Sequence, residues 1–153
     1  MAQRRAPVIP YRNPFVTALL CLVTFSIYTL YWFTITGRAL RQATSVHVPD
    51  FLKVVIYPLL GFYCLLLLTA AIDASAPGTN WSIDLLYIVA MAGLFVWVIY
   101  TIYWYYLFAR AVHQYTKRFS VILTFFIIII LGFIGVGILQ HQFNSSRWTK
   151  KSS

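Results

Sequence analysis

The chain has 153 residues, of which 61 % are hydrophobic and 10 % are charged, and its formal net charge is +9 at neutral pH. A soluble domain has about 45–50 % apolar and about 25 % charged residues, so this composition excludes an ordinary water-soluble fold. The twelve lysines and arginines flank long apolar runs, which is typical of membrane proteins and speaks against nucleic acid as the partner.

Four apolar runs are long enough for a bilayer core, which takes about 20 helical residues. None of them contains Asp, Glu, Lys or Arg, and they cover residues 14–36, 54–72, 85–109 and 119–139. We therefore expect an all-α integral membrane protein. We also expect a basic N-terminal tail (1–13), a non-cytoplasmic connection between the second and third runs (73–84) and a basic C-terminal tail (144–153).

Proline and glycine mark the starts and breaks of the runs. The first run begins at Asn13-Pro14, and proline fits the first turn of a helix. In the second run we expect a kink at Pro58 and Gly61, because proline removes a backbone hydrogen bond. The fourth run contains three glycines that permit either close helix packing or a break, namely Gly132, Gly135 and Gly137.

A segment of twenty residues occurs twice, at 25–44 and at 97–116, with nine identical positions at a fixed offset of 72. This duplication predicts two tandem repeats, 14–72 and 85–143, with two membrane segments each. Each copy carries aromatic and polar side chains at helical spacing. They are Tyr28, Tyr31, Trp32, Ile35, Arg38 and Gln42 in the first copy, and Tyr100, Tyr103, Trp104, Leu107, Arg110 and Gln114 in the second.

This stripe has two interpretations. Tyrosine and tryptophan settle where apolar and wet zones meet, so the stripe is either an interface belt or a packing seam between the repeats. Alternatively, the aromatics line a shared groove with Arg38 and Arg110 at its mouth, which would hold a lipid headgroup or another anionic ligand.

The distribution of cations leaves two topologies open. The N-terminal tail, the first connection, the third connection and the C-terminal tail hold three lysines or arginines each, and the middle connection holds none. If all four runs span, six cations lie on each side. If the first and fourth runs are re-entrant hairpins, with breaks at 24–26 and 132–137, all twelve lie on one side, as the positive-inside rule favours. Both topologies put the Arg38 and Arg110 ends on one side, which we expect to be cytoplasmic.

The run Leu20-Cys-Leu-Val-Thr-Phe-Ser-Ile-Tyr-Thr-Leu-Tyr-Trp-Phe33 resembles the domain-of-unknown-function family 4234, a family of small prokaryotic membrane proteins. Its members show Thr-x-Gly-Ile-Tyr followed by a Tyr-Trp pair. Ser26 stands where the family has glycine, and the matching residues are Thr24, Ile27, Tyr28, Tyr31 and Trp32. The end Leu139-Gln-His-Gln-Phe-Asn144 is similar to the family's closing Gln and Asn. The resemblance implies a multi-pass membrane protein and supplies no activity.

The sequence offers no catalytic motif. Its only acids are Asp50, Asp73 and Asp84, and it has neither a phosphate-binding glycine loop nor a histidine and cysteine cluster with metal-ligand spacing. We therefore expect no enzyme, no cofactor and no metal.

The first hypothesis for the function is a structural or accessory subunit of the cell membrane that forms a homo-oligomer or joins a larger membrane complex. The alternatives are a protein that shapes the bilayer or binds its lipids, anionic ones above all, and an oligomeric pore or carrier.

Overall fold

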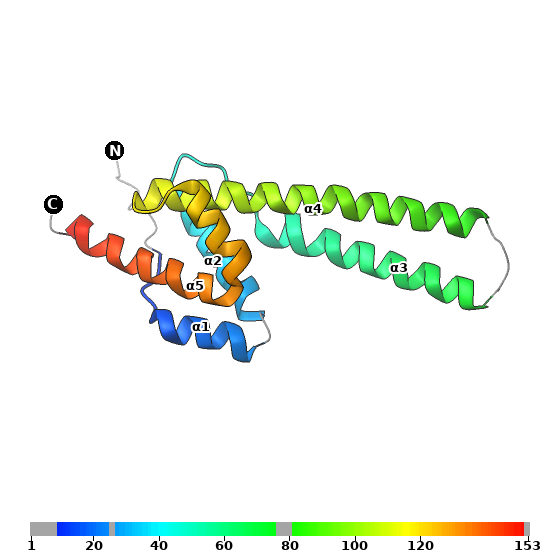
Figure 1. Cartoon of the computed structure of the whole chain (residues 1–153), viewed down its shortest axis with the longest axis horizontal. Helices are drawn as coiled ribbons and strands as arrows, with labels where there is room; N and C mark the ends of the chain where they lie inside the picture. Colours follow the sequence, from blue (N-terminus) through cyan, green and yellow to red (C-terminus); the bar gives the residue numbers. More distant parts are fainter. Residues whose placement is uncertain (1–8, 25–26, 76–80, 152–153) are drawn as a thin grey trace, which may run out of the picture. The chain divides into compact units, whose positions relative to one another are not determined.

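The computed structural model describes residues 9–24, 27–75 and 81–151. Within these ranges the chain is helical and has no strand, which confirms the prediction of an all-α protein. The elements are α1 (Pro14–Val23), α2 (Ile27–Ala43), the π-helical turn η1 (Leu52–Ile56), α3 (Tyr57–Ser75), α4 (Trp81–Thr116) and α5 (Val121–Lys151) (Figure 1).

The helices belong to two compact units. Unit 1 holds the chain up to Phe51 and from Trp104 onward, and unit 2 holds Leu52–Tyr103. These units differ from the tandem halves 14–72 and 85–143 that the duplication predicts, because each unit takes residues from both halves.

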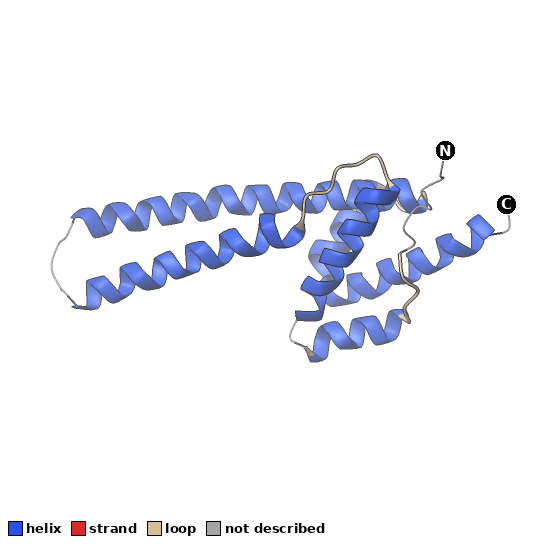
Figure 2. Cartoon of the chain, turned by 180° about the vertical axis from the view of Figure 1, so that it is seen from behind, coloured by secondary structure: helices blue, strands red, loops and turns tan. Residues whose placement is uncertain are grey.

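Unit 2 is an antiparallel helical hairpin of α3 and the first part of α4 (Figure 2). The indole N–H of Trp97 donates to the carbonyl of Val55 at 3.0 Å, and Gly93 lies against the ring of Phe62. A Cβ at Gly93 would lie 2.4 Å from Cε1 of that ring, so glycine makes room for the Phe62 side chain between the two helices.

Two helices of the described chain are long and apolar enough to cross a membrane, Leu52–Ser75 and Asp84–Thr116. They correspond to the second and third apolar runs. Only 11 % and 6 % of their most apolar stretches is buried within the protein. The core helix of a soluble domain would be mostly buried, so these helices leave their apolar side chains for another medium to cover.

The second run continues as α-helix through Pro58 and Gly61, where we expected a kink. Gly61 lies inside α3 with nothing within 4 Å of a Cβ placed there. The irregularity is the π-helical turn Leu52–Ile56, which directly precedes α3. Pro58 has no N–H for the carbonyl of Val54, and the backbone accommodates the missing bond by widening the turn before it.

The first apolar run forms two helices, not one. Asn13 caps α1, its side-chain oxygen accepting from the backbone N–H of Phe15 at 3.0 Å. Thr24 ends α1, where its hydroxyl donates to the carbonyl of Leu20 at 2.7 Å. The same hydroxyl oxygen accepts from the backbone N–H of Tyr28 at 3.0 Å, in the first turn of α2. Of the break expected at 24–26, residues 25 and 26 lie outside the described residues.

The fourth run is also interrupted. Gly132 has φ 47° and ψ −115° inside α5, a conformation open to glycine and strained for any other residue. A Cβ at Gly135 would lie 2.4 Å from the carbonyl oxygen of Ile127, so the two parts of α5 fold closely against each other. The second part packs beside α1, with the position of a Gly137 Cβ 3.0 Å from that of Ala18 (Figure 1).

Helices extend into two segments that the sequence analysis treats as a connection and a tail. Helices α3 and α4 extend into the connection expected at 73–84, of which residues 76–80 lie outside the described residues. Helix α5 continues to Lys151 through most of the expected C-terminal tail at 144–153. Of the N-terminal tail, residues 1–8 also lie outside the description, and Ile9 is buried.

Candidate functional site

An aromatic cluster fills the centre of unit 1. Phe33 of α2 meets the rings of Trp104 and Phe108 edge-on, at centroid distances of 5.7 and 5.2 Å. The ring of Trp104 in turn stacks on Phe108 at 5.2 Å and contacts Phe51 at 4.7 Å. Trp32 joins the cluster through Phe33 and Phe108. The cluster joins α2 to the C-terminal part of α4, because edge-on and offset ring pairs stabilise such contacts by about 0.5–1.5 kcal/mol each.

Both tryptophans of the duplicated segment are buried, and each finds one partner for its indole N–H. Trp104 donates to the carbonyl of Pro49 at 2.8 Å. Trp32 donates to the side-chain oxygen of Gln140 in α5 at 2.9 Å. A buried indole without an acceptor is destabilising, so these bonds fix the orientation of both rings.

Gln140 is the centre of a buried polar network. Its side-chain nitrogen donates to the carbonyl of Pro10 at 3.2 Å and to the side-chain oxygen of Asn144 at 3.1 Å. Asn144 in turn donates to the carbonyl of Arg12 at 2.6 Å. Gln140 is 1 % exposed and Asn144 is 7 % exposed. The network therefore ties the N-terminal segment to α2 and α5 in a place closed to solvent.

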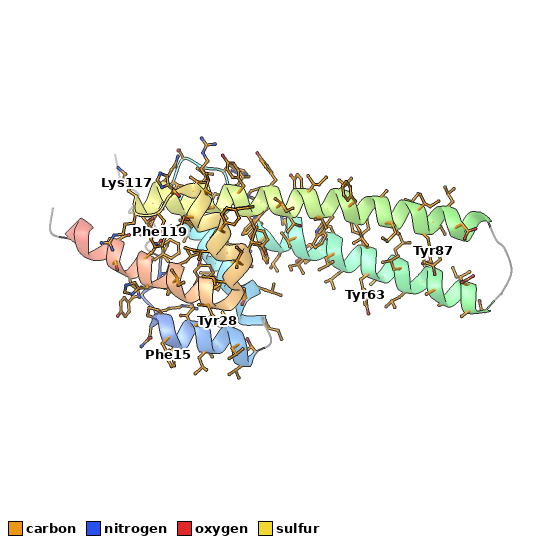
Figure 3. The ribbon with its side chains drawn as sticks, in the orientation of Figure 1. Phe15, Tyr28, Tyr63, Tyr87, Lys117 and Phe119 are labelled. Atoms are coloured by element: carbon orange, nitrogen blue, oxygen red, sulfur yellow. The ribbon has the colours of Figure 1, made fainter. Side chains whose placement is uncertain are left out.

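Arg12 lies over two tyrosines of the stripe. Its guanidinium carbon is 5.7 Å from the ring centroid of Tyr28 and 5.5 Å from that of Tyr31, and its Nη1 donates to the hydroxyl of Tyr28. Partial burial acts to lower the pKa of Arg12, but its interactions with the two phenol groups outweigh burial and leave that pKa raised. Figure 3 labels Tyr28 at the start of α2.

The structure divides the stripe between interior and surface. Trp32 and Trp104 point into unit 1, whereas Tyr31, Tyr100 and Tyr103 are about half exposed. Tyr28 lies between these extremes. The sequence pattern alone did not separate the tryptophans from the tyrosines, because neighbouring positions on one helical face can lie on either side of a packing boundary.

The polar residues at the ends of the stripe have separate surroundings. Arg38 is bound to Asp50 at 3.1 Å, with side chains 57 % and 16 % exposed. Arg110 and Gln42 are exposed. Gln114 accepts a hydrogen bond from the hydroxyl of Ser45 at 3.1 Å, which joins the ends of α2 and α4.

A shallow hollow of about 560 Å³ lies at these two helix ends. It contains neither Arg38 nor Arg110, and its lining is Ala43, Thr44, Ser45, His113, Gln114 and Lys117. A ring nitrogen of His113 is hydrogen-bonded to the carbonyl of Phe119. Lys117 has φ 54°, the left-handed conformation that commonly ends a helix. These contacts serve the helix ends and supply no catalytic group.

The sequence pattern did not identify the residues that make most of the contacts in this site. Arg12 belongs to a tail that the sequence presents as solvent-exposed, and no periodicity links it to Tyr28 or Tyr31. The apolar Phe33 and Phe108 carry no signal that separates core from lipid contact in so hydrophobic a chain. Gln140 and Asn144 were marked only by the resemblance of the closing segment to the family pattern.

The described residues hold no group of three or more His, Cys, Asp or Glu that could bind a metal ion. The helix-break residues lie outside this polar site, with Pro58 and Gly61 in unit 2 and the glycines of α5 in unit 1. Comparison of the chain with family models, curated proteins and solved structures finds no match.

Proposed function

We propose that this chain is a structural protein of the cell membrane that inserts into one leaflet of the bilayer and thereby bends it. In this proposal α3 and α4 are the two membrane-spanning helices. The observation that carries the proposal is a pair of apolar helices too short to span, Pro14–Val23 and Val121–Gly132. At 1.5 Å per residue they reach about 15 and about 18 Å, roughly half of a hydrocarbon core of about 30 Å. Each ends at a break in the helix, as a re-entrant hairpin requires.

The surfaces of these short helices suit contact with acyl chains. Phe15 and Val23 of α1 are 75 % and 65 % exposed, and Ile122 and Ile130 of α5 are 69 % and 70 % exposed. In water, so many exposed large apolar side chains would promote aggregation.

The charge distribution favours the same arrangement. With α3 and α4 as the only spans, all twelve lysines and arginines lie on one side, and we infer that this side is cytoplasmic. These cations would hold anionic lipid headgroups against the hairpins. The protein then adds volume to one leaflet and recruits lipid there, and an area difference between leaflets bends the membrane. The resemblance to family 4234 is compatible with this proposal and adds no activity to it.

The test is the shape of liposomes that contain anionic lipid and a high density of reconstituted protein, examined by electron cryomicroscopy. We expect tubes or small buds with the native chain. Gly132→Ala should reduce them, because it strains the break in α5. Gly61→Ala is the matched control, since a Cβ there meets open space. Vesicles that stay spherical with the native chain would exclude the proposal.

A second candidate is an accessory subunit that assembles with copies of itself or with another membrane protein. It is favoured by the exposed surface of α3, where Gly61 leaves room for a helix to approach closely. Crosslinking in native membranes followed by mass spectrometry distinguishes the two candidates. A stable complex at low protein density supports the subunit, and a monomer that still bends vesicles supports bilayer shaping.

A further inference from the structure

We propose that Tyr100 and Tyr103 form a binding site for the primary ammonium group of an ethanolamine phospholipid headgroup. The inference rests on the proposed membrane insertion of α4. It starts from the duplication, because these two tyrosines are the equivalents of Tyr28 and Tyr31 at the offset of 72. We call the two pairs the first and the second tyrosine pair.

The two pairs share a geometry. The ring centroids of Tyr28 and Tyr31 are 5.8 Å apart with an interplanar angle of 43°. Those of Tyr100 and Tyr103 are 6.4 Å apart with an interplanar angle of 46°. One turn of helix separates the members of each pair, so that both rings present their faces on the same side.

The first pair shows what such a pair binds. The Arg12 guanidinium lies over both rings and donates an N–H to the hydroxyl of Tyr28. The pair thus offers two π faces and one phenol oxygen to a single cation. A cation that carries N–H donors satisfies both features, whereas a quaternary ammonium satisfies only the faces.

The second pair has no such partner among the side chains that the structure describes. Tyr100 and Tyr103 are 51 % and 52 % exposed. The residue equivalent to Arg12 is Asp84, which lies 16 residues before Tyr100 on the continuous helix α4, about 24 Å away along its axis. The second copy therefore has no arginine at the position from which Arg12 reaches its tyrosines.

The depth of the second pair matches the headgroup layer. If Asp84 marks one edge of the hydrocarbon core, about 20 residues of α4 cross the roughly 30 Å core, and the other edge falls near Tyr103. The hydrogen bond between Trp97 and Val55 gives the register of the antiparallel hairpin. Residues just before Val55 therefore lie opposite residues just after Trp97, which puts the exposed Lys53 at the level of Tyr100. A lysine and a tyrosine pair at one level suit the phosphate and the ammonium of a single zwitterionic headgroup.

The test is lipid binding to the full-length chain, delipidated and examined by native mass spectrometry with phosphatidylethanolamine, phosphatidylcholine and phosphatidylglycerol of identical acyl chains. We expect the ethanolamine lipid to bind about fivefold more tightly than the choline lipid, because both ammonium groups can contact the ring faces and only the primary one adds a hydrogen bond to a phenol oxygen. Tyr100→Leu combined with Tyr103→Leu should abolish this preference. The milder pair Tyr100→Phe and Tyr103→Phe should keep choline binding and lose most of the ethanolamine preference.

Tyr63→Leu is the matched control, because Tyr63 on α3 is 58 % exposed, has no second tyrosine one helical turn away and projects away from α4 (Figure 3). Equal binding of the two lipids by the native chain, or equal losses in Tyr63→Leu and the paired variants, would overturn the inference. So would a photo-crosslinker at position 103 that captures another protein chain instead of lipid. Flotation of each variant with liposomes separates the two proposals, since a chain that floats without headgroup preference contradicts only the ammonium site.

Discussion

The indole N–H of Trp32 donates to the side-chain oxygen of Gln140 at 2.9 Å, across 108 positions of the sequence. This bond joins the duplicated segment of the first copy to the last helix, and both partners are buried. Gln140 also holds Pro10 and Asn144, so one side chain satisfies polar groups from three parts of the chain. Buried networks of this kind specify one arrangement because each unmade bond is destabilising.

Replacement of Gln140 by leucine should lower the free energy of unfolding by about 2–4 kcal/mol, since the Trp32 indole N–H loses its acceptor and the Asn144 side-chain oxygen loses its donor. Denaturant unfolding in detergent micelles, followed by tryptophan fluorescence, measures the effect. Gln142→Leu is the control, because Gln142 is equally buried on the same helix and neither of its side-chain polar atoms has a partner in the described structure. That variant should be neutral or stabilising. Equal losses in the two variants would show that the network contributes nothing specific.

Substitution of Gly132 by alanine should destabilise the protein by about 1–3 kcal/mol, because φ 47° with ψ −115° is strained for any residue with a Cβ. Gly61→Ala should instead stabilise α3 by about 0.5–1 kcal/mol, since the position is helical and open. Thermal unfolding midpoints of the two variants in one detergent give the comparison. A Gly132→Ala protein as stable as the native chain would mean that α5 has no glycine-dependent break.

Removal of the cation in Arg12→Gln should lower the free energy of unfolding by about 1 kcal/mol, the strength of a cation–π contact near a surface. The effect should be the same from pH 5 to pH 9. A raised pKa means that the stabilisation is present at every pH below the ordinary arginine value and is lost only above the higher folded value, so no titration falls in this window. Arg12→Lys should recover part of the loss. A loss that varied with pH in this range would point to another titrating group.

Labelling of single cysteines should report two spans. In a chain with Cys21 and Cys64 replaced by alanine, cysteines at Tyr11 and His47 should react with an impermeant maleimide from the cytoplasmic side, and a cysteine at Ala74 from the opposite side. These three positions are exposed. The result follows from hairpins that return to the side on which they enter. If position 11 reacts together with position 74, four runs cross and the re-entrant arrangement is wrong.

Much of the helical framework follows directly from the sequence. The apolar runs at 54–72 and 85–109 predict the two long helices, because only length and the absence of charge are needed for that inference. The break near Thr24 and the break at Gly132 follow from a hydroxyl that competes for backbone bonds and from a residue without a Cβ.

The site is less predictable because its contacts are long-range. In a chain this apolar, Phe33 in the core and Phe15 on the surface look alike, since the usual contrast between buried apolar and exposed polar residues is lost. The position of Arg12 over Tyr28 depends on how α1 folds back, which local propensity does not determine. We expected a kink at Pro58 and Gly61. The irregularity instead lies before Pro58, because a proline disturbs the turn that precedes it.

The Thr24 hydroxyl ends α1 and accepts from the first turn of α2, and it has no counterpart at the offset of 72. The equivalent position is Val96, and α4 runs straight through it. Valine has no oxygen with which to replace a backbone partner. Two segments with matching residues at the offset of 72 thus differ at the atom that decides between turning and continuing, so that one bends where the other runs on as a single helix.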